Sequence, residues 1–198
     1  EDCLTLNVSA PVSISNTSAS RPVLVWIHGG GYRTGQGAIP WYNGTRFARD
    51  QDIVVVSINY RLGALGFADL THLGDEFKTS NVNGMLDQIA ALQWVQRNIE
   101  AFGGDPKRVT IAGESAGAFS VGALMGCSAA QGLFSQAIAQ SGAAHHTLPP
   151  AAAQTVGQTF CEHLGQNNAV GVMAASVEDI LSAQTTTAAE FESGAGFN

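Results

Sequence analysis

The sequence has few charged residues, little cysteine and no long apolar run. Only 13% of its 198 residues are charged, with 16 acidic against 9 basic side chains and a formal net charge of −7. This negative balance argues against nucleic acid or an anionic membrane surface as a partner. No apolar segment approaches the roughly 20 residues that a membrane-spanning helix needs. These absences leave a globular domain, which the 45% of hydrophobic residues supports.

Cysteine is too sparse and too irregular to indicate a metal centre. Cys3, Cys127 and Cys161 are an odd number, and no CxxC spacing occurs among them. A zinc site is therefore not expected, and at least one thiol is free or pairs with a group outside this chain. No motif in the sequence indicates a cofactor, so none is expected.

Three Asn-x-Ser/Thr sequons occur, at Asn7, Asn16 and Asn43. In a chain in which Ser and Thr are common, one or two would arise by chance, so they favour a secreted origin only weakly. Both ends of the chain look cut, because Glu1 is not a start methionine and 193–198 is a loop-like run with no closing element. We therefore expect a domain truncated at both ends.

Short apolar runs rich in Val and Ile alternate with amphipathic stretches along the chain. We expect strands at 4–8, 23–27, 53–58, 109–112 and 137–139, and helices at 87–102, 116–125, 151–164 and 177–183. The polar stretch 185–187 follows the last of these helices. Continuous apolar strands suit a mostly parallel sheet that is covered on both faces. The alternation predicts an α/β fold with a central sheet flanked by helices.

Gly113-Glu114-Ser115-Ala116-Gly117 stands between a predicted strand and a predicted helix, which is the setting of a nucleophile elbow. Glycines fit both flanks, because side chains in so sharp a turn would meet neighbouring backbone. The turn pushes Ser115 out of the sheet edge at a helix N-terminus, where developing negative charge is favoured. The motif alone is weak, since this composition produces it by chance about 0.2 times per chain. Its context makes Ser115 the candidate nucleophile.

His28-Gly29-Gly30-Gly31 follows another predicted strand and is rarer, with a chance expectation of about 0.01. The oxygen of a tetrahedral intermediate needs backbone N–H donors about 3 Å away, and glycine lets the backbone approach that closely. The N–H of Ala116, just after the nucleophile, would complete such an oxyanion hole. A plain strand-to-loop turn is the alternative interpretation of the glycine run.

Together these motifs resemble the type-B carboxylesterase family of α/β-hydrolases, which includes cholinesterases and bacterial para-nitrobenzyl esterases. The matching segments lie in family order and weaken after about Pro150: 1–4, 28–32, 59–63, 87–88, 102–106, 113–117, 132–134 and 140–142. The resemblance implies an α/β-hydrolase fold, with residues 1–198 forming part of one domain whose C-terminal part is absent. It also implies a small-molecule ester as the substrate.

The resemblance implies a role for each residue of the two motifs. Ser115 would form the acyl-enzyme, and the amides of Gly30, Gly31 and Ala116 would form the oxyanion hole. Glu114 would be a buried carboxylate that shapes the site, although a purely structural acid fits it equally well.

Three further matches are structural in character. The resemblance implies that Arg61 and Asp87 satisfy buried polar partners. Cys3 matches a family cysteine that often pairs with one upstream of Glu1, so its partner would be missing here.

Tyr32, Trp41 and Phe119 could line a substrate pocket, with ordinary packing as the alternative for each.

The chain departs from the family in its acid and base, which follow the nucleophile in the order acid, then histidine. Only one histidine after Ser115 follows any acid. It is His163, whose neighbour Glu162 shares its predicted helix, so the two cannot occupy separate loops. The pair His145-His146 precedes every acid that follows Ser115, so it is interpreted as a solvated loop, and metal binding is not expected there. We expect the acid and base beyond Asn198, and the 198-residue piece alone to be nearly inactive and poorly soluble.

Two other functions stay open at this point. The family contains non-catalytic adhesion proteins that keep the fold, although Ser115 and the glycine run argue against that interpretation. A complete small hydrolase or binding module is the other alternative. The sequence leaves the identity of the ester and the oligomeric state undetermined.

Overall fold

The computed structural model describes residues 2–12 and 21–194, with side chains described through Phe191. The predicted sequon at Asn16 lies outside the described residues. The chain forms two compact units, the first made of Glu1–Arg61 with Met85–His146 and the second of Leu62–Gly84 with Thr147–Asn198. The first unit contains the central sheet and both glycine-rich motifs.

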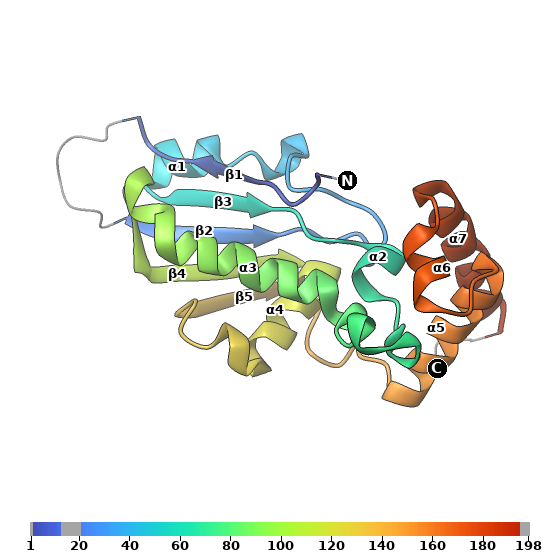
Figure 1. Ribbon diagram of the computed structural model, residues 1–198. Helices are drawn as coiled ribbons and strands as arrows, with labels where there is room; N and C mark the ends of the chain where they lie inside the picture. Colours follow the sequence, from blue (N-terminus) through green and yellow to red (C-terminus); the bar gives the residue numbers. More distant parts are fainter. Residues whose placement is uncertain (1, 13–20, 195–198) are drawn as a thin grey trace. The chain divides into compact units, whose positions relative to one another are not determined.

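The first unit is built on a five-stranded sheet in the order β1-β3-β2-β4-β5 (Figure 1). Its strands are β1 (Leu6–Ser9), β2 (Arg21–Ile27), β3 (Val54–Ile58), β4 (Gly104–Glu114) and β5 (Gln136–Gln140). All neighbours pair in parallel except β1, which is antiparallel to β3. The mostly parallel sheet is thus confirmed. Strand β4 starts earlier than predicted, because a left-handed Gly103 ends the preceding 3-10 helix and the chain extends from the next residue.

Helices α1 (Thr45–Gln51), α3 (Asn83–Asn98) and α4 (Ala116–Gly126) lie beside this sheet (Figure 1). Short 3-10 helices η1 (Pro40–Tyr42), η5 (Ile99–Phe102) and η6 (Ser128–Ala130) join the elements. The predicted apolar stripe of α3 is buried, with Leu92, Val95 and Ile99 fully inaccessible to solvent. The helices expected at 87–102 and 116–125 are confirmed.

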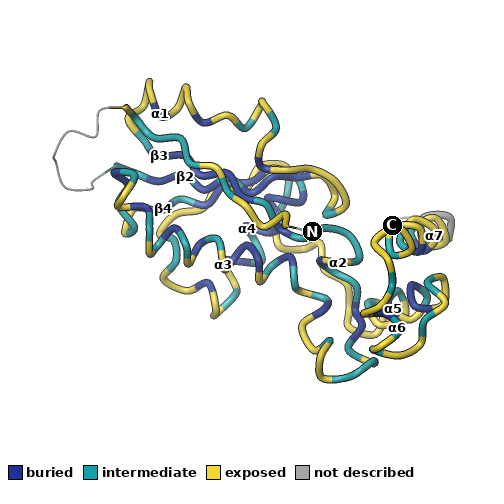
Figure 2. The backbone as a smooth tube through the Cα atoms, turned by 45° about the horizontal axis from the view of Figure 1, so that its top comes forward, coloured by how far each residue is buried: buried dark blue, intermediate teal, exposed yellow. Residues whose placement is uncertain are grey.

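One face of the sheet forms the core of the first unit. The register aligns Val23 with Val109 and Val25 with Ile111, and all four side chains are at most 1% exposed. Complete burial of such a side chain contributes about 1.5–3 kcal/mol to folding. Figure 2 shows the buried segments concentrated in β2, β3 and β4. The core therefore fixes the strands from which both glycine-rich motifs emerge.

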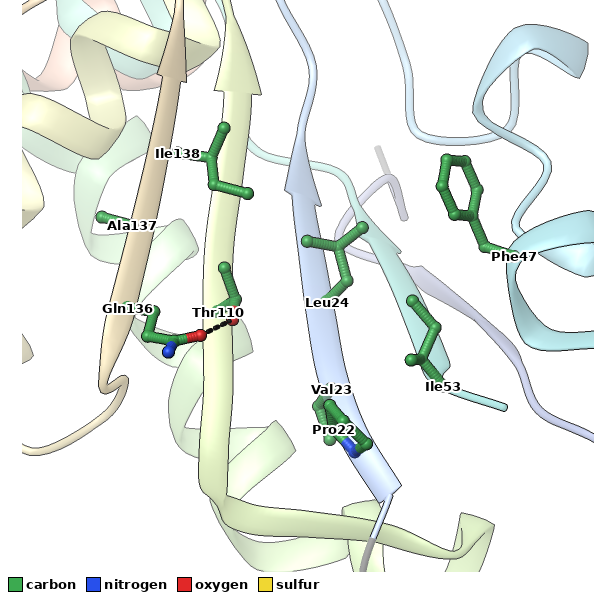
Figure 3. Close-up of a pocket in the computed structure, with 9 residues that line it drawn as sticks. All are labelled: Pro22, Val23, Leu24, Phe47, Ile53, Thr110, Gln136, Ala137 and Ile138. Carbon is green, nitrogen blue, oxygen red and sulfur yellow. Dashed lines mark hydrogen bonds between the residues drawn. The ribbon is translucent and has the colours of Figure 1, made fainter. Parts of the chain in front are cut away.

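The other face of the sheet is open toward β5. Leu24, Thr110 and Ile138 project there into an open apolar hollow that Phe47 of α1 borders on the far side (Figure 3). Strand β5 lies at the sheet edge, and all five of its residues are exposed. Within the described residues, β5 is therefore an uncovered edge of the sheet.

The second unit is helical, with α2 (Gly63–Phe67), α5 (Pro150–Leu164), α6 (Ala169–Ala174) and α7 (Val177–Gly194). It also contains η2 (Thr71–Leu73), η3 (Asp75–Phe77) and η4 (Ser80–Val82). Its core is formed by the buried residues Leu70, Phe160, Cys161, Val172 and Ala183. No helix within the described residues is both long enough and apolar enough to cross a membrane.

The predicted end of the last helix near Ala183 is wrong, because α7 continues through the threonine run. The three hydroxyls bond back to carbonyls four residues earlier, Thr185 to Leu181, Thr186 to Ser182 and Thr187 to Ala183. Their polar atoms are thereby satisfied inside the helix. The polar stretch therefore does not break it.

Candidate active site

Ser115 occupies the sharp turn between β4 and α4. Its backbone has φ 54° and ψ −121°, which is rare for a residue with a side chain and costs about 1–3 kcal/mol. Two hydrogen bonds hold it there: its N–H donates to the carbonyl of Gln140 at the end of β5 (2.9 Å), and its carbonyl accepts from Phe119 N–H (3.0 Å). The surrounding sheet and helix thus impose the kink on the serine.

Glycine is required on both sides of this turn. A Cβ at Gly113 would meet the backbone of Gly117, and a Cβ at Gly117 would overlap the carbonyl oxygen of Ile27. The first turn of α4 therefore lies directly against the end of β2. This close approach explains the small residues that the sequence places there.

The glycine bend, which we define as residues 28–31 after β2, lies beside the nucleophile turn after β4. A Cβ at Gly29 would stand 3.2 Å from the Cβ of Ser115 and 2.6 Å from the carbonyl oxygen of Glu114. β2 and β4 are neighbouring parallel strands, so their carboxyl ends meet at one edge of the sheet. The structure thus brings the two sequence motifs together.

Hydrogen bonds fix the direction of the peptide between Gly30 and Gly31. The carbonyl of Gly30 accepts from the N–H groups of Arg33 and Thr34, each at 3.0 Å. In a trans peptide the carbonyl and the following N–H point in opposite directions. The N–H of Gly31 therefore points away from the turn that Arg33 and Thr34 close.

The preceding peptide is oriented by His28. Its Nδ1–H donates to the carbonyl of Gly29 at 2.8 Å, so the N–H of Gly30 points away from the imidazole. His28 is buried, its ring stacks on Tyr60 at a centroid distance of 4.5 Å, and the Tyr60 hydroxyl donates to the His28 carbonyl at 2.7 Å. Burial lowers the pKa of His28 against the opposing effect of the bond to Gly29. The imidazole is therefore neutral near pH 7, with its proton on Nδ1.

The amide of Ala116 is the first in α4, where no carbonyl of the helix lies in reach. Among the hydrogen bonds of the described residues, none has the amide of Gly30, Gly31 or Ala116 as its donor. Three backbone donors thus stay available at the edge of the sheet where Ser115 lies.

Glu114 differs from the expectation of a buried carboxylate, because it is exposed in this chain. Its partner in the sheet is Gln140 of β5, beside which the described part of the chain places no further strand. The carboxyl end of β4 is therefore open to solvent on that side. Burial of Glu114 would need additional chain over this edge.

No side chain of the described residues forms a hydrogen bond with the Oγ of Ser115. His145 and His146 are exposed, as expected for a loop pair, and His146 packs on the ring of Phe119 with centroids 4.1 Å apart. His163 belongs to the second unit, where Nδ1 contacts the hydroxyl of Thr187. Within the described residues, no histidine is therefore hydrogen-bonded to the nucleophile.

The remaining sequence candidates are structural or exposed. Arg61 and Asp87 form a bidentate salt bridge, in which the Nε–Oδ2 and Nη2–Oδ1 distances are both 2.8 Å. Trp41 of η1 is 90% exposed, whereas Tyr32 is half-buried. All three cysteines are free: Cys3 is exposed, Cys127 is partly buried and Cys161 is buried. Within the described part of the chain, no cluster of three or more His, Cys, Asp or Glu could hold a metal ion.

Sequence reasoning missed the roles of three residues: Tyr60 supports His28, Ser120 contacts Tyr32, and Gln88 donates to Ser120. The sequence did contain a signal for two of them. Gln88 lies four residues before Leu92 on the buried stripe of α3, and Ser120 interrupts an apolar helix. A polar residue at a core position needs a partner, which marks both as members of a network.

Comparison with known proteins agrees with this geometry. Residues 1–194 match the profile of the Carboxylesterase family. The chain is 44% identical to the para-nitrobenzyl esterase of Bacillus subtilis over 185 residues, which is 92% of this chain and 37% of that protein. It is 50% identical to the cholinesterase of Mus musculus over 145 residues, or 73% of this chain and 23% of that protein.

Solved structures support the same assignment. The Geobacillus stearothermophilus carboxylesterase EST55 superimposes with a TM-score of 0.88 and 42% identity over 93% of this chain and 39% of that one. A para-nitrobenzyl esterase structure matches with a TM-score of 0.86 and 44% identity, covering 93% of this chain and 38% of its own. The chain thus spans well under half the length of these relatives. It belongs to the carboxylesterase family and has the α/β-hydrolase fold.

Proposed function

We propose that this chain carries the nucleophile and the oxyanion hole of a serine carboxylic-ester hydrolase. The observation that carries the proposal is that the strained Ser115 lies in close contact with Gly29. A hydrogen bond from His28 orients the peptide that follows Gly29. The three donors would be the amides of Gly30, Gly31 and Ala116. Such strain at a serine is typical of a reactive group that the surrounding fold holds in place.

In the proposed reaction, Ser115 Oγ attacks the ester carbonyl carbon and its proton passes to a general base. The carbonyl oxygen becomes an oxyanion that the three amides stabilise, and the alcohol then leaves with a proton. Water hydrolyses the resulting acyl-enzyme to release the acid. Each donor of an oxyanion hole typically lowers the barrier by about 3–4 kcal/mol.

The acid and histidine of the triad would come from sequence beyond residues 1–198. This fits the absence of a base beside Ser115 in the described residues and the greater length of the matched relatives. Without them Ser115 keeps its proton near neutral pH, and only about 10³–10⁴ of rate enhancement over water would persist. Glu114 would be covered in the longer protein and would then shape the site from the end of β4.

The substrate would be a small-molecule ester. Relatives named for para-nitrobenzyl esters and for choline esters have similar sequences, and the exact ester stays open. Para-nitrophenyl acetate and a para-nitrobenzyl ester are therefore suitable first substrates.

The test uses the full-length protein encoded by the complete reading frame. A fluorophosphonate should label Ser115, identified by peptide mass spectrometry, and the protein should hydrolyse para-nitrophenyl acetate. Ser115→Ala should abolish both, whereas Ser128→Ala, which alters an exposed serine outside the turn, should leave both unchanged. A folded full-length protein that neither labels nor hydrolyses any ester would instead support a non-catalytic adhesion or binding member of the family.

A further inference from the structure

Three side chains, those of Tyr32, Ser120 and Gln88, form a hydrogen-bond network next to the glycine bend. The Tyr32 hydroxyl lies 3.1 Å from the Oγ of Ser120, and Nε2 of Gln88 donates to the same Oγ at 3.0 Å. Gln88 and Ser120 are completely buried. The network thus connects Tyr32, which follows Gly31, with a buried residue of α4 and a buried residue of α3.

Tyr32 is held in a conformation that tyrosine rarely adopts, with φ 58°. A bulky residue stays in this left-handed region only where its surroundings hold it. The residue before it is Gly31, whose amide is one of the proposed donors. Relaxation of φ at Tyr32 would turn the peptide between Gly31 and Tyr32, which directly adjoins the peptide that carries the Gly31 N–H.

Ser120 connects Tyr32 to the nucleophile. It lies in α4, the helix that starts directly after Ser115, and it is fully buried. A hydrogen bond from Tyr32 to this helix consequently relates the glycine bend to the element that positions Ser115. The bond fixes a distance between the two halves of the proposed site.

Gln88 indicates that this hydrogen-bond network has a role beyond packing. Its Oε1 is buried and has no hydrogen-bond partner among the described residues. An apolar side chain of similar size would avoid that cost. The amide is explained by its Nε2–H, which occupies one lone pair of the Ser120 Oγ and so orients the hydroxyl for its bond with Tyr32.

We propose that Tyr32, Ser120 and Gln88 are positioning residues that hold the glycine bend at its working distance from Ser115. They act through the backbone of the bend and not on the reacting atoms. The inference rests on the proposed function and adds the residues that set the geometry of its oxyanion hole.

The test compares Tyr32→Phe, Ser120→Ala and their double variant in the full-length protein. Each single variant should lower kcat for para-nitrophenyl acetate by about 10- to 100-fold with KM within about twofold, because a misplaced hole affects the transition state and not substrate binding. The double variant should be no slower than the slower single variant, because both substitutions remove the same hydrogen bond between Tyr32 and Ser120. Should Ser120→Ala reduce the folded fraction, Tyr32→Phe, which deletes one oxygen from a half-buried residue, carries the test alone.

The matched control is Ser80→Ala. Ser80 is a buried serine whose Oγ accepts from the N–H of Leu70, in the second unit. It should lower the thermal midpoint by a similar amount and leave kcat unchanged. Amide hydrogen exchange over residues 28–34 should accelerate in the Tyr32 and Ser120 variants and stay unchanged in Ser80→Ala.

The outcomes separate the two proposals. If the wild-type protein is active and Tyr32→Phe keeps both kcat within twofold and the exchange rates, the positioning role is overturned while the proposed function stands. Equal loss of kcat in Ser80→Ala would also overturn it, because the effect would then be general destabilisation. A folded wild-type protein that neither hydrolyses an ester nor labels at Ser115 would overturn both proposals.

Discussion

The hydroxyl of Tyr60 donates a 2.7 Å hydrogen bond to the carbonyl of His28, while the two rings stack. This contact encloses the imidazole and leaves its Nδ1–H for the carbonyl of Gly29. The histidine of the glycine motif is thus a buried, neutral donor that orients backbone. Its burial links the geometry of the proposed oxyanion hole to pH.

The first prediction concerns the stability of the protein in mild acid. The pKa of His28 is lowered by burial below its ordinary value of 6.5, so the unfolded chain takes up a proton that the folded chain resists. The free energy of unfolding should therefore fall as the pH drops below 6.5, with this group adding at most about 1.4 kcal/mol per pH unit. His28→Phe keeps a ring on Tyr60 and should show a shallower decline in urea unfolding between pH 7 and pH 5. Identical declines in both proteins would contradict it.

The second prediction concerns the contact between the bend and the nucleophile. A methyl group at Gly29 would press on the carbonyl of Glu114 and on Ser115, so Gly29→Ala should displace the bend. We expect kcat of the full-length protein to fall about 10²- to 10³-fold, as for a lost oxyanion donor, with little change in KM. Gly126→Ala is the control, because its Cβ would meet nothing within 4 Å at the end of α4. Full activity of a folded Gly29→Ala would rule out this geometry.

The third prediction separates two ion pairs. Asp87 is nearly buried and bonds the half-exposed Arg61 through both carboxylate oxygens, whereas Asp50 and Arg49 pair in solvent. Asp87→Asn should lower the free energy of unfolding by about 1–3 kcal/mol, less than for a completely buried pair because water screens the guanidinium. Asp50→Asn should leave it almost unchanged, because both partners of that pair stay in solvent. Urea titrations of both variants at pH 7 test the difference, and equal effects would disprove it.

Sequence reasoning predicts what local chemistry dictates. The elbow is predictable because flanking glycines in a strand-to-helix context leave few other conformations for Ser115. The parallel sheet follows from runs such as 23–27, whose residues are apolar on both faces. These features depend on neighbours in sequence, so their patterns are visible in the sequence itself.

One local feature was misjudged, and features that depend on distant partners could not be predicted. The polar run that contains Thr187 predicts the end of the helix, but its hydroxyl bonds the carbonyl of Ala183 within α7. The exposure of Glu114 depends on what lies beside β5, which no local pattern encodes. Gln88 and Tyr32 are 56 positions apart and meet only through Ser120.

The last prediction concerns the edge strand of the 198-residue chain expressed alone. Ile138 is 47% exposed on β5 and faces the open apolar hollow, so copies of the chain can pair through this edge. Ile138→Lys should reduce light scattering at pH 7 and leave the thermal midpoint within about 1 °C, because the side chain contributes little to the core.

Ala129→Lys is the matched control, since Ala129 is exposed in η6 away from the strand. Both substitutions reduce the net negative charge by one, so a pure charge effect would raise the scattering of both variants equally. A decrease confined to Ile138→Lys would assign the association to the edge of β5. An equal response of the two variants would mean that the chain associates through another surface, and the exposed edge would then have to be protected by its own twist or short length.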